Sequence, residues 1–247
     1  MTPHSALQTL DHRPWPLPSE SWRWRQSWRD LLFIHWPVPA ATLERHLPGG
    51  LALDQFDGTA WIAVVPFRMT GVSLRGVPDL PRLSAFPEIN VRTYVTAGGR
   101  PGVWFLSLDA ANWWAVKAAR RLFHLPYYHA SMSCRAEAGV VDYSSVRKES
   151  PEAEFKGRYW PSGPVEEALP GTLEHWLTER YALYASDGDG TLGRADIHHA
   201  PWPLQPATAE VERDTMLAPY GISVAGEPLL HFASRLDVVV WGLQPTG

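Results

Sequence analysis

The chain has 247 residues, of which 45% are hydrophobic and 19% charged, and its formal net charge is −4 at pH 7. This length and apolar content allow a domain with a sizeable core and exclude general disorder. No basic block stands out and no segment reaches the roughly 18 apolar residues of a membrane helix, so neither nucleic acid nor a membrane is expected as a partner. The one cysteine, Cys134, excludes an internal disulfide and predicts a reducing, cytoplasmic setting.

The first 21 residues are rich in Pro, His and Ser without periodicity, and they predict a loosely ordered leader over 1–21. Beyond it the composition never shifts enough to divide the chain, so a single domain is expected over 22–247. Alternation from Trp22 runs into the apolar segment 31–34, which predicts a first strand with a bend before Pro37.

Period-two runs bounded by Gly and Pro predict most of the later elements. The expected strands are 51–54, 59–70, 88–97, 103–108, 127–137, 140–147, 152–159, 180–185, 192–197, 207–214 and 229–241. The expected helices are 39–47, one capped by Asp109 or Asn112 that runs through Phe123, and one after Pro170. Asp57-Gly58 predicts a hairpin between the first two of these strands, and 71–87 is expected to be a loop. Many short strands with few helices indicate an α+β fold built on one curved or barrel-like, predominantly antiparallel sheet.

The densest set of polar residues lies in the segment 86–130. In an extended strand, Glu88, Asn90 and Arg92 share one face. A carboxylate, an amide and a guanidinium in a row can bind a carbonyl or carboxylate ligand, or orient a general acid or base. The alternative is a solvated face on which Glu88 and Arg92 pair with each other, and general frequencies for charged residues favour that alternative. Tyr127 and Tyr128 on a nearby strand favour a pocket instead.

Other reactive groups give weaker signals. Lys117 lies on the helix away from its apolar face, so a solvated amine is expected rather than a Schiff-base nucleophile. The adjacent pair His198-His199 points to opposite faces of a strand and cannot bind one ion together. No nucleophile elbow, phosphate loop or dinucleotide fingerprint occurs. We therefore expect neither a metal nor a cofactor.

Several segments resemble the YqjF-like family of uncharacterised bacterial proteins. They include W-R-D-L-L-F-I-H-W-P-V-P at 28–39, F-D-G-T-A-W-I-A-V-V-P-F at 56–67, F-P-E-I-N-V-R-T-Y-V at 86–95 and A-R-R-L-F-H-L-P-Y at 119–127. The similarity extends from Trp22 to Trp241. That family is grouped with the acetoacetate decarboxylase-like superfamily, so the resemblance implies a curved, cone-shaped β-barrel that encloses a small cavity.

The resemblance also bears on the chemistry. The active-site segment of the decarboxylase has an arginine followed by Gly-Phe-Pro-Lys-Lys, whose first lysine forms a Schiff base while the second lowers its pKa. Arg120 matches that arginine, but Tyr127 and Tyr128 stand in place of the two lysines. The Schiff-base mechanism is therefore not expected. Glu88, or Asn90 after a two-residue shift, matches the strand glutamate of the decarboxylase.

Three functions follow from this reading. The first is a barrel that binds a small carbonyl- or carboxylate-containing ligand. The second is an enzyme, a lyase, hydratase or isomerase of a small oxo acid, with Glu88 as base and a tyrosine as electrophile. The third is a structural or partner-binding protein with a Trp-rich surface. A homo-oligomer is left open. The residues expected around the cavity are Glu88 and Tyr127 as catalytic candidates, with Asn90, Arg92, Arg120 and Tyr128 as ligand-binding candidates.

Overall fold

The computed structural model describes residues 4–78, 84–187 and 189–246. Its strands are β1 (Trp24–Val38), β2 (Ala52–Leu53), β3 (Ala60–Leu74), β4 (Phe86–Ala97), β5 (Arg100–Ala110), β6 (Tyr127–Glu137), β7 (Val140–Arg147), β8 (Glu154–Pro161), β9 (Ala182–Ser186), β10 (Leu192–His199), β11 (Gln205–Asp214), β12 (Leu229–Val240) and β13 (Gln244–Pro245). Its helices are α1 (Ala40–Glu44), α2 (Trp113–Phe123) and α3 (Leu173–Thr178), with 3-10 turns η1 (Ser5–Leu7) and η2 (Ala218–Tyr220).

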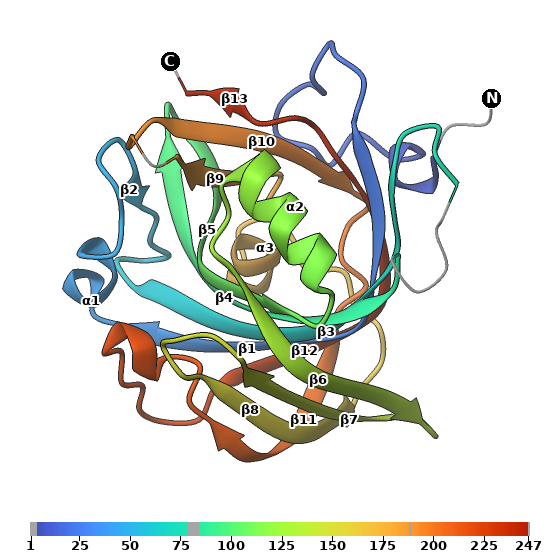
Figure 1. Ribbon diagram of the computed structural model, residues 1–247, viewed down its shortest axis with the longest axis vertical. Helices are drawn as coiled ribbons and strands as arrows, with labels where there is room; N and C mark the ends of the chain where they lie inside the picture. Colours follow the sequence, from blue (N-terminus) through green and yellow to red (C-terminus); the bar gives the residue numbers. More distant parts are fainter. Residues whose placement is uncertain (1–3, 79–83, 188, 247) are drawn as a thin grey trace.

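Seven strands close into a ring in the order β12, β1, β3, β4, β5, β9 and β10, which pairs again with β12. Figure 1 looks into this ring, with α2 across its front and α3 farther back. The strands β6, β7, β8 and β11 form a second path from β5 back to β12. Nearly all of the described strand pairs are antiparallel, while β5 runs parallel to β6 and β9. The α+β fold with a curved, mostly antiparallel barrel is thereby confirmed.

The wall from β12 to β5 is shared by both paths, and this position buries both faces of β4. Ile89 and Val91 belong to the hydrophobic core on one side. Glu88, Asn90 and Arg92 point to the other side, and all three are buried. The alternative of a solvated face for these residues is therefore wrong, because their side of β4 faces the interior of the closed seven-stranded ring.

The hairpin predicted at Asp57-Gly58 is wrong in its pairing. The turn itself forms, with positive φ at both residues, and a bridge joins Phe56 to Thr59. However, β2 pairs with β4, not with β3. The physical reason is that β4 extends beyond its pairing with β3, which ends at Thr93, so the edge of β4 at 95–96 is free for β2. The expected loop 71–87 is also shorter, since β3 continues to Leu74; residues 79–83 lie outside the described residues.

The described part of the expected leader packs on the barrel. Ala6 is buried against Val239 and Trp241. The guanidinium of Arg13 pairs with Asp196 at 2.6 Å, and both side chains are buried. These contacts attach Ala6 and Arg13 to the barrel, because a buried ion pair fixes both of its members in place.

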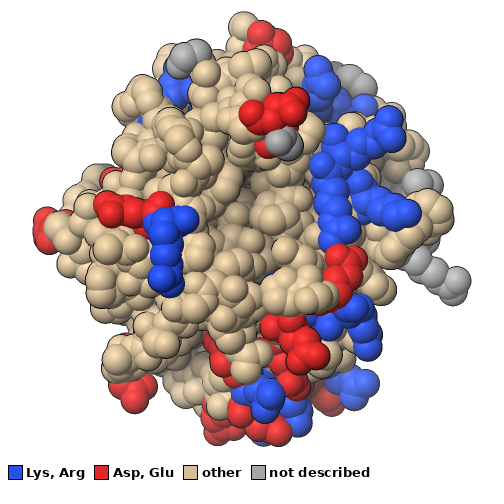
Figure 2. All heavy atoms as spheres, turned by 60° about the vertical axis from the view of Figure 1, so that its left-hand side comes forward, with Lys and Arg blue, Asp and Glu red and all other residues tan. Residues whose placement is uncertain are grey.

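Charged side chains are concentrated on one part of the molecule's surface (Figure 2). Charged side chains of both signs gather at its lower end in Figure 2, which is where β7, β8 and β11 lie in Figure 1. Exposed pairs across these strands include Lys156 with Glu212 and Arg213 with Glu154. Within the described ranges, no helix is both long and apolar enough to cross a membrane.

Candidate functional site

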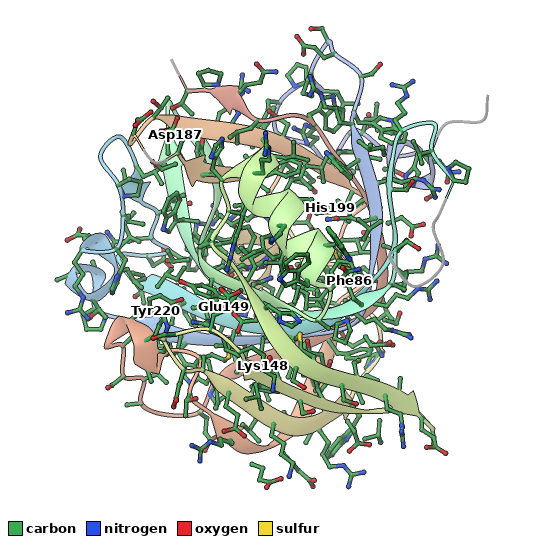
Figure 3. The ribbon with its side chains drawn as sticks, viewed as in Figure 1. Phe86, Lys148, Glu149, Asp187, His199 and Tyr220 are labelled. Atoms are coloured by element: carbon green, nitrogen blue, oxygen red, sulfur yellow. The ribbon has the colours of Figure 1, made fainter. Side chains whose placement is uncertain are left out.

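A cavity of about 160 Å³ lies within the seven-stranded ring. Its polar wall residues come from β1, β4, β6, α3, the segment before β9, and β10: Gln26, Glu88, Asn90, Arg92, Tyr127, Thr178, Arg180 and His199. Its apolar wall includes indole, phenyl and aliphatic side chains: Trp24, Trp28, Val65, Phe67, Met69, Phe86, Leu122, Phe123 and Trp202. Phe86 and His199, both labelled in Figure 3, lie near α2 inside the ring. The cavity is therefore mixed, with charged groups inside a mainly aromatic shell.

Four of the six predicted residues line this cavity together: Glu88, Asn90, Arg92 and Tyr127. Side chains of successive residues in a strand point to opposite faces, so Tyr127 enters the ring and Tyr128 does not. The ring of Tyr128 instead covers the guanidinium of Arg147 at 4.0 Å. The expectation that Tyr128 faces the cavity is thereby corrected.

Arg120 is also predicted to line the cavity, and in the structure it does not. Its Nε donates to the backbone carbonyl of Tyr127 at 2.6 Å. Its Nη2 pairs with Glu149, which Figure 3 places apart from Phe86 and His199, in the segment between β7 and β8. Both charged groups of this pair are partly exposed. Arg120 therefore closes the turn between α2 and β6 and does not line the cavity.

Glu88 and Tyr127 form a buried pair. The Tyr127 hydroxyl donates to Oε2 of Glu88 at 2.9 Å, and Glu88 is only 1% exposed. Burial raises the pKa of Glu88 to about 8, although the bond from Tyr127 opposes the shift. Burial, followed by the neighbouring Glu88 carboxyl, raises the pKa of Tyr127 well above its usual value. At neutral pH the site therefore holds a protonated carboxyl beside a neutral phenol, and both can donate a hydrogen bond.

Arg92 is the unusual charge of the site. It is 8% exposed, and its guanidinium carbon lies 5.0 Å from the ring centre of Phe33. Nη2 donates a long bond of 3.4 Å to the carbonyl of Leu177. Among the described residues no carboxylate forms an ion pair with Arg92, and its Nε has no hydrogen-bond partner. A buried cation without a counter-charge costs several kcal/mol, which a bound anion would offset.

Arg180 lies beside this charge but has its own partner. Its Nη1 pairs with Asp54 at 2.6 Å, and its guanidinium carbon lies 4.3 Å from the ring centre of Trp176. Nη2 is left without a hydrogen-bond partner in the described part of the chain. The same holds for the indole nitrogens of Trp28 and Trp202. Three buried N–H donors from separate elements therefore join Arg92 around the cavity.

His35 and Tyr94 lie near Arg92, whose guanidinium carbon is 5.7 Å from the ring centre of Tyr94. His35 Nε2 and the Tyr94 hydroxyl are 2.6 Å apart. Burial, and secondarily the charge of Arg92, lowers the pKa of His35 well below its usual value. Because His35 is neutral, it adds no second positive charge to this part of the molecule.

Sequence reasoning missed many of the wall residues, among them Trp28, Arg180, His199 and Trp202. The signal at Arg180 is the tripeptide E-R-Y at 179–181, a further segment that resembles the YqjF-like family, but it indicates no role. Lys117 is exposed as expected, with Nζ 3.8 Å from the ring centre of Trp113. No lysine lines the cavity in the portion of the chain that the structure describes. An amine for a Schiff base is thus missing from its wall.

Comparisons with known proteins agree with this architecture. The model of the family DUF2071, described as "Uncharacterized conserved protein (COG2071)", matches residues 25–237. The uncharacterised protein YqjF of Bacillus subtilis (strain 168) is 44% identical over 229 residues, which cover 92% of this chain and 94% of that protein.

Solved structures show the same fold at low sequence identity. The enduracididine biosynthesis enzyme MppR complexed with pyruvate has a TM-score of 0.64 at 11% identity, with 90% of each chain covered. Acetoacetate decarboxylase from Legionella pneumophila has a TM-score of 0.61 at 13% identity, with 96% of this chain and 93% of that chain covered. The chain therefore belongs to the DUF2071 family of uncharacterised conserved proteins, and its fold is that of the acetoacetate decarboxylase-like proteins.

Proposed function

We propose that the cavity binds a small oxo acid, with the carboxylate of the ligand beside Arg92. The observation that carries this proposal is the buried guanidinium of Arg92, which has no carboxylate partner among the described residues. An anionic ligand would supply the missing counter-charge through charge-assisted hydrogen bonds. The free donor of Arg180 and the indole N–H of Trp202 could reach the same group.

The carbonyl of the ligand has its own candidates. Asn90 and Glu88 follow Arg92 on the same face of β4. A protonated Glu88, held in place by the hydrogen bond from Tyr127, can donate a hydrogen bond to a carbonyl oxygen and polarise it; the Tyr127 hydroxyl can replace it as donor if its proton turns from Glu88 to the ligand. The structural relative MppR is described as a complex with pyruvate, an oxo acid, which supports this chemical class.

Native mass spectrometry of freshly purified protein tests the proposal, since a retained ligand would appear as a discrete added mass. Calorimetric titration with pyruvate and with pyruvamide then compares two ligands of similar shape, of which only pyruvate carries a negative charge. We expect the acid to bind at least about tenfold more tightly than the amide, because only the acid pairs with Arg92. Equal affinity for the two compounds, or no binding of either, would overturn the proposal.

A second function is favoured by the Glu88–Tyr127 pair. A carboxyl with a pKa of about 8 can act as a proton donor below that pH and as a base above it. Such a group beside a carbonyl suits a lyase, hydratase or isomerase that moves a proton next to the oxo group. In the simplest step, Glu88 accepts a proton from the carbon next to the carbonyl, and the oxygen of the resulting enolate accepts a hydrogen bond from Tyr127.

Exchange of the methyl protons of pyruvate, or of the C3 methylene protons of 2-oxobutanoate, against deuterium in the solvent tests this enzyme proposal. Nuclear magnetic resonance would follow the loss of the proton signal. We expect the exchange rate to rise with pH and level off above about 8, and to fall to the uncatalysed rate in Glu88→Gln. An unchanged rate in that variant would remove Glu88 from the mechanism.

A further inference from the structure

We propose that the acid bound in this cavity carries an apolar tail of several carbons, which lies between β3, β4 and α2. The inference rests on the proposed binding of an oxo acid and names its class more narrowly. Three features of the cavity carry it: the order of residues along β4, the position of the surface opening and the space left by α2.

The cavity is polar at one end and apolar at the other. Along β4 the wall residues change from Arg92 through Asn90 and Glu88 to Phe86. The partner of Phe86 on β3 is Met69, which also lines the cavity. A ligand with its carboxylate at Arg92 therefore passes Asn90 and Glu88 first and then reaches apolar surface at Phe86 and Met69.

The apolar end is the one nearer to solvent. Leu122 lines the cavity and is nevertheless 53% exposed, whereas the polar residues of β4 are buried. Beside Leu122, the rings of Phe123 and Trp24 lie 6.0 Å apart. An acid that enters beside α2 would place its charged head deep in the ring, and its tail would lie between these aromatic rings.

The helix α2 leaves room for that tail. Three of its cavity-facing residues are alanines: Ala115, Ala118 and Ala119. The volume of about 160 Å³ accommodates roughly ten water-sized groups, which is more than a pyruvate molecule fills. Phe86 and Arg92 are six positions apart on β4, so this wall extends over as much as about 20 Å. A three-carbon acid at Arg92 would leave the apolar end in contact with water.

Calorimetric titration with straight-chain 2-oxo acids, from pyruvate to 2-oxooctanoate, tests the inference. Each methylene group that moves from water to the apolar wall should raise the association constant by about fourfold, until the chain fills the cavity. The association constant could instead stay constant or fall with chain length while pyruvate still binds more tightly than pyruvamide. That result would contradict the apolar tail of the ligand but not the proposed binding of an oxo acid. Absence of binding for every acid would overturn both.

Filling the apolar end provides the matched test. Ala119→Phe should reduce the affinity for 2-oxooctanoate at least about tenfold more than the affinity for pyruvate, because the new ring occupies the space of the tail. Arg121→Phe adds the same ring at an exposed position of α2 outside the cavity wall and should leave both affinities unchanged. If Ala119→Phe does not fold, Ala118→Phe at a more exposed site replaces it. Equal effects of the cavity variant on both acids would contradict the inference.

Discussion

Two buried arginines of this protein lie in contrasting surroundings. Arg147, at the end of β7, donates two hydrogen bonds of 2.7 and 2.8 Å to the carboxylate of Asp109, and both side chains are fully buried. The ring of Tyr128 covers the pair. Arg92, on β4, has aromatic neighbours as well, but no carboxylate pairs with it among the described residues.

Burial alone therefore does not distinguish a structural charge from a charge that binds a ligand. Asp109 satisfies Arg147 within the protein, and the pair holds β5 to β7. Arg92 faces a cavity, and none of the residues that the structure describes supplies its counter-charge. A natural protein keeps an uncompensated buried charge at a cost in stability, and such costs are usual at functional sites.

The largest expected effect is at the paired arginine. Arg147→Met leaves Asp109 buried without a partner, so the free energy of unfolding should fall by about 3–5 kcal/mol in a urea titration. The double variant Asp109→Leu with Arg147→Met removes both charges and should recover most of the loss. If the double variant is as unstable as the single one, the loss comes from packing and not from the unpaired carboxylate.

Glu88 links the cavity to pH. Its pKa rises from 4.5 to about 8 on folding, so between these values the folded protein holds a proton that the unfolded chain lacks. The stability contributed by Glu88 is fully present below pH 4.5 and is lost as the pH rises to about 8. Glu88→Gln cannot titrate. Wild type therefore loses stability as the pH rises from about 5 to about 8, and Glu88→Gln lacks this loss. The difference in the free energy of unfolding, variant minus wild type, should increase by a few kcal/mol over this range.

Urea titrations across this pH range measure the effect. Glu212→Gln is the matched control, because Glu212 is an exposed glutamate on β11 and its substitution should leave the pH dependence of the wild type unchanged. Parallel pH profiles for Glu88→Gln and wild type would show that the carboxyl of Glu88 titrates normally in the folded protein.

The unpaired arginine should respond in the opposite direction from the paired one. Arg92→Met removes a buried charge that lacks a counter-charge, so the ligand-free protein should keep its stability or gain about 1 kcal/mol. Differential scanning calorimetry of ligand-free protein measures this directly. A loss as large as that in Arg147→Met would mean that Arg92 has a structural role and that the contrast between the two arginines fails.

The smallest effect is expected at the surface. Lys156 and Glu212 approach to 2.7 Å, but their side chains are 54% and 68% exposed. Lys156→Ala should change the free energy of unfolding by at most about 1 kcal/mol, because solvent already screens the pair. A larger loss would show that distance, and not burial, decides what an ion pair contributes in this protein.

Most of the fold could be predicted from local patterns. The hairpin of β6 and β7 has the predicted bounds, because Ala138-Gly139 adopts the positive φ values that its turn requires. The partner of β2 could not be predicted, because a turn signal does not reveal which strand edges are already occupied. The cap of α2 was narrowed to two residues, and Asn112 is the one that accepts from the first turn.

The candidate site was predictable in part for the same reason. The period of two placed Glu88, Asn90 and Arg92 on one face, and the structure brings Tyr127 to them. Whether that face was buried depended on β9, β10 and β12, which close the ring and lie far away in the sequence. Arg180 and Trp202 reach the cavity only through the closed ring, so no local pattern could identify them.

The role of Arg92 as the partner of the ligand carboxylate is tested most directly by the affinity of Arg92→Met for pyruvate. Calorimetry would measure this affinity beside those of wild type and of Arg121→Met. Arg121 is an exposed arginine of α2 that does not line the cavity, so its substitution controls for the loss of one positive charge. We predict that Arg92→Met weakens binding by about 10- to 150-fold, the effect of losing hydrogen bonds to a charged group, while Arg121→Met binds as wild type does. Equal affinity in all three proteins would contradict the assignment of Arg92 as the counter-charge of the ligand.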